Sequence, residues 1–549
     1  MQRKTVYLET FGCQMNALDS ELVVGQLAAL GYRFTDAPED AGVILYNTCS
    51  VRDRAEQKVR SRLGELAARK RRDASLVVGV LGCMAERDGT DLIRRMPVVD
   101  ILCGPAELDR LPALLDNAVR TRASLTGADG SDRSARQVAL QGGASRRTAT
   151  LAAAEDRLEL LDLARTISPT DHAGSAYVRI TRGCNKFCTY CVVPYTRGAE
   201  VHRPPDHIVD ECKRLADAGV IEVTLLGQTV NHYRFEHGAA VTISGVTQPQ
   251  KGRSHKGGHR RDPFTGARVT TFADLLKRIH DEVPAIRRLR FVTSYPRDFG
   301  DDALEVIRDS PRICRYLHVP AQSGSDRVLA RMNRGYTVGE YLDFLDRARE
   351  ILDQPDIGRP LMIAGDMIVG FPGESDEDFA ASVRLLDRAR YKNCFIFKYS
   401  PRPGTTAFDR IPDDVPDEVK RRRNNELLAV QHGISDEIAQ AQVGATLEVF
   451  VEGLSARERR HRAPRTAGSV ALTVAGRSMG FAGADQAEHA AHADDGANAA
   501  QLTGRTDGDL IVLFDAPAGV APDDLIGRIA PVRIERANTL TLFGSLVRE

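Results

Sequence analysis

Short β-rich runs alternate with helical patterns over most of this 549-residue chain. In the first part, apolar residues such as Leu18, Leu22 and Leu27 repeat at helical spacing between four such runs, at 6–11, 43–47, 76–81 and 98–102. Because strands that alternate with helices form parallel sheets, we expect an α/β domain with an open parallel sheet over residues 4–120. Residues 121–169 are rich in Ala, Gly, Ser and Arg, which predicts a linker with a short helix near 155–165.

The alternation resumes in a second part, residues 170–408. Its six candidate strands lie at 176–181, 222–226, 289–293, 316–319, 362–369 and 393–399. Six βα units are typical of a partial, open (β/α)6 barrel. The segment at about 234–268 breaks the rhythm and predicts a disordered loop insertion.

A long helix, at about 415–440, leads to a third part. Short strands are predicted there at 446–452, 509–514, 527–534 and 540–546. This pattern indicates a small all-β barrel over residues 436–549. A low-complexity segment at about 455–500 interrupts it as a second insertion.

The charge balance is neutral, with 75 basic and 75 acidic residues. A nucleic-acid binder normally has a basic excess, so local runs are the only electrostatic evidence for such a partner. Two runs stand out, at 69–72 and 420–423. Each could contact phosphates, or could complement the dipole of a helix end or form a solvated face. The chain has no apolar stretch long enough to span a membrane and no signal-peptide pattern, and its ten cysteines suit a reducing cytoplasm.

Cys184, Cys188 and Cys191 are spaced C-x3-C-x2-C. Three thiolates can bind three corners of a four-iron cluster, whereas a cluster that only transfers electrons normally has four cysteines. A structural zinc site needs four ligands, usually in two pairs, and a disulfide framework belongs to small secreted chains. The spacing therefore favours an iron–sulfur site with one open iron.

Three further cysteines, Cys13, Cys49 and Cys83, each directly follow a predicted strand. Because the carboxyl ends of parallel strands form one edge of a sheet, we expect these thiols to converge. Cys103 also ends a predicted strand, so a cysteine in this position can be incidental. Topology alone leaves two readings open: a second cluster, or three buried free cysteines.

The motif at 184–191, with its extension Val192–Gly198, resembles the radical S-adenosylmethionine (SAM) superfamily. The segments at 10–20, 47–52 and 82–83 resemble the N-terminal domain of the radical SAM methylthiotransferases. This resemblance implies one 4Fe-4S cluster that binds SAM through its open iron and one auxiliary 4Fe-4S cluster that delivers sulfur. Their ligands would be Cys184, Cys188 and Cys191 for the first, and Cys13, Cys49 and Cys83 for the second.

The implied chemistry replaces C–H by C–S–CH3. Reductive cleavage of one SAM would give a radical that takes a hydrogen atom from the substrate, and a second SAM would methylate the added sulfur. Four cysteines match no ligand motif and are expected to be structural: Cys103, Cys212, Cys314 and Cys394.

Four polar residues on loops after the predicted barrel strands are expected to contact SAM, because functional groups of such barrels collect there. They are Gln228, Ser294, Gln322 and Ser323. Tyr190 would pack near the adenine or the cluster, or belong to the core.

The segments at 183–198 and 47–52 are most similar to the branch of the family that modifies C2 of N6-dimethylallyladenosine-37 in tRNA. The C-terminal strands, with Thr503–Thr506, resemble the RNA-binding TRAM domain, although both insertions depart from the typical pattern. The resemblance implies a cytoplasmic monomer with tRNA as substrate and an electron donor such as flavodoxin or ferredoxin. Two alternatives remain: methylthiolation of a ribosomal-protein aspartate, and a non-catalytic iron–sulfur RNA-binding protein.

Overall fold

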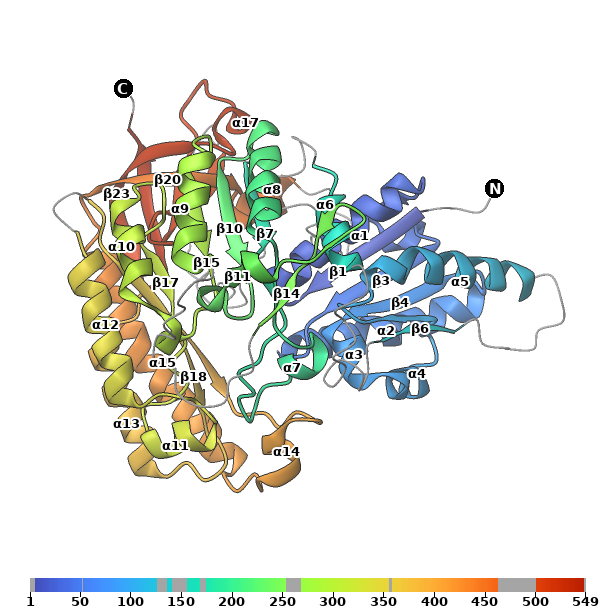
Figure 1. Cartoon of the computed structure of the whole chain (residues 1–549), viewed down its shortest axis with the longest axis horizontal. Coiled ribbons are helices and arrows are strands. Elements are labelled where there is room, and N and C mark those ends of the chain that lie inside the picture. Colours follow the sequence, from blue (N-terminus) through green and yellow to red (C-terminus); the bar gives the residue numbers. More distant parts are fainter. Residues whose placement is uncertain are drawn as a thin grey trace.

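The computed structural model describes residues 5–51, 53–125, 136–140, 156–167, 174–252, 268–354, 358–462 and 500–547. Within them the chain forms an N-terminal sheet domain, a larger central barrel domain and a small C-terminal barrel (Figure 1). None of the described helices is both long and apolar enough to cross a membrane.

The N-terminal domain is an open sheet of six parallel strands, as the alternation predicts. The strand order is β2 (Arg33–Phe34), β1 (Thr5–Phe11), β3 (Val43–Thr48), β4 (Val77–Gly82), β5 (Ile101–Cys103) and β6 (Gln137–Ala139). The sheet is covered on one face by α1 (Gln14–Ala29) and α5 (Leu111–Leu125), and on the other by α2 (Asp53–Arg72), α3 (Cys83–Asp88) and α4 (Thr90–Arg95). Alternate residues of each strand pack into two apolar cores, one on each face of the sheet. Leu45 packs toward α1, whereas Ile44 and Tyr46 pack toward α2.

The predicted linker needs a correction, because β6 lies inside it and extends the sheet past residue 120. A three-residue edge strand has no periodicity that could reveal it. The short helix expected near 155–165 is α6 (Arg157–Leu163). Most of the remaining linker lies outside the described residues.

The central domain is a partial barrel of six parallel strands. They are β7 (Ser175–Arg179), β10 (Glu222–Leu226), β16 (Arg288–Phe291), β17 (Tyr316–His318), β18 (Met362–Val369) and β19 (Asn393–Lys398). The two halves meet where Leu289 bridges to Ile313 and the amide of Ser294 donates to the carbonyl of His318 at 3.1 Å. The outer helices are α8 (Pro205–Asp217), α9 (Phe272–Glu282), α10 (Asp301–Asp309), α12 (Val338–Leu352), α13 (Asp376–Ala389) and α15 (Asp417–Gln440). The large apolar core lies between these helices and the strands.

The prediction of a disordered loop over 234–268 is wrong for the described part of that segment. There, β11 (Arg234–Glu236) pairs with β15 (Val269–Thr271), β12 (Thr242–Ile243) pairs with β13 (Val246–Thr247), and β14 (Gln250–Lys251) pairs with β9 (Val201–His202). Strands of two or three residues are too short to show a hydrophobic period. Residues 253–267 lie outside the described part.

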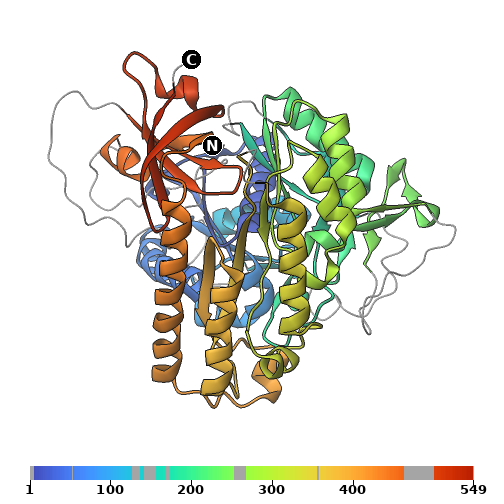
Figure 2. The ribbon, with the colours of Figure 1, turned by 90° about the vertical axis from the view of Figure 1, so that its left-hand side faces the viewer.

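The third part is a closed five-stranded barrel in the order β20 (Thr446–Leu454), β21 (Gln501–Thr506), β22 (Ile511–Asp515), β24 (Thr541–Leu546) and β23 (Ile529–Asn538). The second insertion begins with α16 (Ala456–Arg462), and residues 463–499 lie outside the described part. Figure 2 shows the small barrel seated at the end of α15. Its β21–β22 turn contacts the starts of the central strands, since Arg288 and Arg290 of β16 donate to the carbonyls of Arg505 and Thr506.

Candidate active site

The first cysteine trio occupies the loop between β8 (Thr181–Arg182) and α7 (Val193–Thr196). Backbone hydrogen bonds fold this loop, from the amide of Cys184 to the carbonyl of Gly198 at 3.1 Å and from Cys191 to Cys188 at 3.0 Å. Burial raises the pKa of Cys184, with Glu200 and the other two thiols adding to the shift. Burial and the neighbouring Cys188 raise the pKa of Cys191 to about 12. The three thiols thus lie close together, and Cys184 and Cys191 ionise with difficulty unless a cation is present.

The second trio is also brought together, as strand topology predicts. Cys49 follows β3, Cys83 opens α3, and Cys13 precedes α1. A hydrogen bond with Cys13 raises the pKa of Cys49, and burial and the proximity of Cys83 raise it further. Such crowding of three thiols is a feature of metal and cluster sites, where the bound group makes the thiolates stable.

An amide network holds the turns that carry this second trio. Asn16 of α1 donates to the side-chain carbonyl of Asn47 at 3.0 Å, and Asn47 returns a hydrogen bond to the backbone carbonyl of Asn16 at 2.9 Å. Asn47 also donates to Ser20 at 2.9 Å. Because these groups are buried and mutually satisfied, they fix α1 against the end of β3 and so fix Cys13 beside Cys49.

The two trios face each other across the junction of the first two domains. Helix α3, which begins with Cys83, packs against α7, and the two lie side by side in Figure 1. The thiol of Cys83 is near enough to Cys191 to contribute to raising its pKa. Arg197, which directly follows α7, forms an ion pair with Asp19 of α1 at 2.8 Å and lowers the pKa of Cys83 against the effect of burial. Arg197, a buried cation of the central domain, therefore favours the thiolate form of Cys83 in the N-terminal trio.

The other four cysteines pack elsewhere. Cys103 lies in the core of the N-terminal sheet and donates to the carbonyl of Glu107 at 3.2 Å. Cys212 and Cys394 belong to the core of the central domain, and Cys314 is buried beside Arg288 and Arg290.

The residues predicted to contact SAM lie on loops after β10, β16 and β17. The side chain of Ser294 is only 3% exposed, and its hydroxyl oxygen has no hydrogen-bond partner in the described part of the chain. Ser323 is also buried, but its hydroxyl accepts the amide of Ser325 at 3.2 Å. Gln322 is buried in a left-handed conformation with φ +75, and Gln228 is half-buried. Ser294 thus offers a fully buried hydroxyl that has no partner within the described residues.

Comparisons with known proteins show to which family this arrangement belongs. Residues 5–104 match the uncharacterized protein family UPF0004, and residues 178–386 match the radical SAM superfamily. The chain is 41% identical to the tRNA-2-methylthio-N(6)-dimethylallyladenosine synthase of Rhodopirellula baltica over 98% of this chain and 95% of that protein. It is 37% identical to the synthase of the same name from Burkholderia multivorans over 99% and 97% of the two chains. The chain belongs to this synthase family.

Among solved structures, a radical S-adenosylmethionine methyltransferase from Kitasatospora setae, TsrM, covers 74% of this chain and 77% of its own, at 15% identity and a TM-score of 0.44. The family relationship, by contrast, extends over nearly the full length. The chain is accordingly a radical SAM enzyme that combines an N-terminal UPF0004 sheet domain with a radical SAM domain and a TRAM-like C-terminal barrel.

Sequence reasoning missed a half-buried arginine that lies against the first trio. Arg334 donates to the sulfur of Cys188 at 3.4 Å and to the hydroxyl of Tyr190 at 3.5 Å. Its guanidinium lies over the rings of Tyr295 at 4.5 Å and Tyr336 at 5.0 Å. No local motif marks Arg334, because it comes from the loop after α11 (Asp326–Arg331) and reaches Cys188 through tertiary packing. Tyr190, which belongs to the cysteine loop itself, also packs against a small apolar core cluster with its ring next to that of Phe371.

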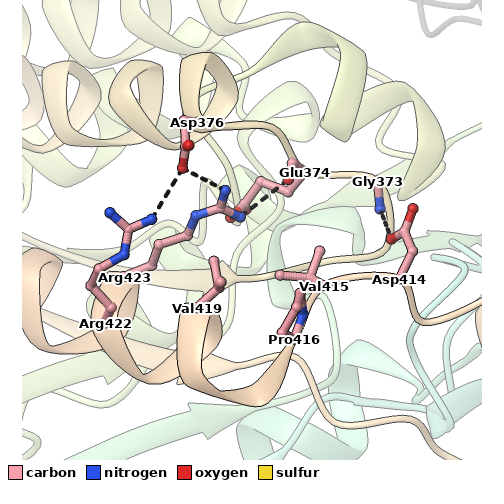
Figure 3. Close-up of a pocket in the computed structure, with 9 residues that line it drawn as sticks. All are labelled: Gly373, Glu374, Asp376, Asp414, Val415, Pro416, Val419, Arg422 and Arg423. Carbon is pink, nitrogen blue, oxygen red and sulfur yellow. Dashed lines mark hydrogen bonds and ion pairs between the residues drawn. The ribbon is translucent and has the colours of Figure 1, made fainter.

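The basic runs, in contrast, have intramolecular partners. Arg422 and Arg423 pair with Asp376 at 3.2 and 2.9 Å, and Arg423 also pairs with Glu374 at 2.8 Å (Figure 3). These residues line a pocket of about 290 Å³ between α15 and the loop before α13. Lys420 pairs with Asp413 at 2.6 Å. In the run at 69–72, Arg69 donates to the carbonyl of Ala41 at 2.6 Å and Lys70 pairs with Asp100. Five of the eight residues in the two runs thus have partners within the fold, while Arg71, Arg72 and Arg421 are exposed.

Proposed function

We propose that this chain methylthiolates tRNA, converting the C2–H bond of N6-dimethylallyladenosine-37 into C2–S–CH3. The observation that carries the proposal is the pair of cysteine trios that face each other across the domain junction. Membership of the synthase family supports the same reaction. A non-catalytic RNA-binding protein would need neither trio, and an electron-transfer protein would normally use four cysteines for each cluster.

The cysteines present fit two 4Fe-4S clusters, because each trio brings three thiols together in a place where a bound cation would stabilise the thiolates. Cys184, Cys188 and Cys191 would hold the cluster that binds SAM, and Cys13, Cys49 and Cys83 would hold the auxiliary one. When bound, the first cluster supplies the electron that cleaves SAM, the auxiliary cluster supplies sulfur, and SAM supplies the methyl group. Such chemistry is carried by cofactors, while the protein binds and orients them.

The chain's own residues would set the environment of these groups. Arg334 and Arg197 each place a guanidinium beside one trio, and their charges oppose the raised pKa of Cys191 and of Cys83, respectively. The unpartnered hydroxyl of Ser294 would contact SAM, together with Gln228, Gln322 and Ser323. Burial of the cysteines at the junction of two domains would exclude water from the reacting centre.

The proposal extends to the partners of the enzyme. The TRAM-like barrel would bind the tRNA, and Arg533 and Arg536 of β23 are exposed cations suited to phosphate contacts. We propose that the enzyme works as a monomer in the cytoplasm with flavodoxin or ferredoxin as electron donor. The ten free cysteines fit that reducing compartment.

The cluster assignment is tested by counting iron and sulfide in the full chain after anaerobic reconstitution. We expect about eight iron atoms per chain, and about half as many after Cys49→Ala or Cys83→Ala. The matched control Cys103→Ala, from the same domain, should keep the full count. One cluster only, with Cys13, Cys49 and Cys83 all open to alkylation, would overturn the proposal.

The substrate is tested by competition. Reduced enzyme and SAM are incubated with dimethylallylated tRNA and with the ribosomal protein that carries the alternative aspartate. We expect an added SCH2 unit on the tRNA by mass spectrometry. A gain on the ribosomal protein alone would show that the alternative substrate is correct.

A further inference from the structure

Three potential metal ligands converge behind the Cys184 loop, and the proposed reaction uses none of them. They are Glu200, His202 of β9 and His232 of the short helix η5 (Val230–His232). One ligand atom from each residue lies within 4.8 Å of those of the other two. Glu200 and His202 are buried, at 0% and 3% exposed, and His232 is half-buried.

An ion pair explains only part of this cluster. His232 Nδ1 lies 2.6 Å from Glu200 Oε2, and Thr229 donates to Glu200 Oε1 at 3.3 Å. His202 forms no such pair, and its Nδ1 is buried without a hydrogen-bond partner in the part of the chain that the structure describes. Because buried polar atoms are nearly always satisfied, His202 lacks the hydrogen bonding expected of a histidine that only packs in the fold.

The inserted segment lies directly against the same atoms. Strand β14 pairs with β9, and the amide of Gly252 donates to the carbonyl of Glu200 at 2.8 Å. A Cβ at Gly252 would lie 2.7 Å from Glu200 Oε2 and 2.9 Å from His202 Nε2. Any residue larger than glycine at position 252 would therefore clash with these two donor atoms.

We infer that Glu200, His202 and His232 bind one divalent transition-metal ion. Two imidazoles and one carboxylate are a common donor set for such ions, and it differs from the thiolates that iron–sulfur clusters select. Glu200 and His232 lie on loops of the central barrel, and His202 belongs to β9, which pairs with β14 of the insertion. A bound ion would therefore fasten the insertion to the domain. It would also stabilise the cluster loop, since Thr229 lies between Glu200 and Cys184, at 4.0 Å from the sulfur of Cys184.

The test uses Zn²⁺ as the probe on the full chain with both clusters reconstituted. The protein is treated with a chelator, dialysed against a small excess of Zn²⁺, and its zinc and iron are counted by mass spectrometry. We expect one zinc per chain, with two imidazoles and one oxygen in the zinc-edge X-ray absorption spectrum. The zinc edge is separate from that of iron, so the clusters do not obscure it.

His202→Ala and His232→Ala should each weaken zinc binding by more than the roughly 10- to 100-fold that loss of an outer-shell partner costs. The control is His237→Ala, because His237 lies in the same insertion but contacts Thr270 at 2.8 Å. Iron content should stay unchanged in all variants that fold, which separates this site from the clusters. Sulfur ligands at the zinc edge, or equal zinc binding in wild type and His202→Ala, would overturn the inference. If His202→Ala fails to fold, the wild-type spectrum alone still decides.

Discussion

Gly82 occupies a position where any side chain would collide with the fold. It ends β4 with φ +85, directly before Cys83, and a Cβ there would lie 2.4 Å from Asn47 Oδ1 and 2.8 Å from the carbonyl of Thr48. We predict that Gly82→Ala lowers the free energy of unfolding by about 1–3 kcal/mol, because a left-handed conformation and a buried clash both penalise alanine. It should also reduce auxiliary-cluster iron, since Cys83 must move. Urea denaturation and iron content measure the two effects.

Gly64→Ala is the matched control. Gly64 lies within α2, and nothing is within 4 Å of the position a Cβ would take. Alanine should stabilise this helix by about 0.5–1 kcal/mol. Equal unfolding midpoints for the two alanine variants would contradict the account of Gly82.

At the residue scale, the sequence reveals groups whose position follows from one strand. Cys13, Cys49 and Cys83 could be placed together because each follows a strand of one parallel sheet. Arg334 could not, since it reaches Cys188 from 146 residues away through loop packing. The same holds for His202 and His232, whose proximity depends on how two loops fold.

Helix α1 is the element that joins the N-terminal domain to the cluster loop. Its Asp19 is 1% exposed and pairs with Arg179 of β7 at 3.1 Å and with Arg197 at 2.8 Å. Removing one partner of a buried ion pair leaves the other charge uncompensated. We predict that Asp19→Asn lowers the free energy of unfolding by about 3–5 kcal/mol. It should also expose the domain junction to limited proteolysis.

The control for this prediction is Asp116→Asn on α5. Asp116 pairs with Arg120 at 2.9 Å, but both side chains are more than half exposed. A surface pair contributes less than about 1 kcal/mol, so the unfolding midpoint should barely move. A similar loss in both variants would show that burial is not the cause.

The length of a strand decides whether it can be predicted from the sequence. The strands β3, β4, β10 and β18 have five to eight residues, mostly buried and apolar, and the sequence pattern shows them. The pairs β9–β14 and β12–β13 have two residues per strand, and their pairing depends on tertiary contacts. The sequence pattern does not predict strand β21, because this strand directly follows the second insertion and Gly504 interrupts its alternation.

For the whole molecule, the two barrels are joined by buried charges at the end remote from the cysteines. Arg290 of β16 pairs with Glu222 of β10 at 2.9 Å and donates to backbone carbonyls of the β21–β22 turn. Asp509 of that turn pairs with Lys392, which precedes β19, at 2.7 Å. Because the cysteine trios lie at the carboxyl ends of the strands and this junction lies at the starts of the barrel strands, the small barrel can be held firmly without obstructing the candidate active site.

Asp509 provides the test of this junction and of its pH dependence. Burial alone would raise the pKa of its carboxyl, but Lys392, Arg505 and Arg290 outweigh burial and hold that pKa well below its usual value near 4. The ionised carboxylate therefore stabilises the fold above pH 4, and this stabilisation is lost as the pH falls further. We predict that Asp509→Asn lowers the free energy of unfolding at pH 7 by about 3–5 kcal/mol. Asparagine tolerates the left-handed φ of +64, so the variant removes little besides the charge.

The difference between wild type and Asp509→Asn should narrow as the pH is lowered from 4, because the Asp509 carboxyl then takes up a proton in the unfolded wild-type chain while it is still ionised in the folded one. Urea midpoints at pH 7, 4 and 3 measure this narrowing. The control is Asp515→Asn, since Asp515 is exposed at the end of β22 in the same barrel. A constant difference across the three pH values would show that the charge of Asp509 does not hold the barrels together, and that Asp509→Asn acts through altered packing of the turn.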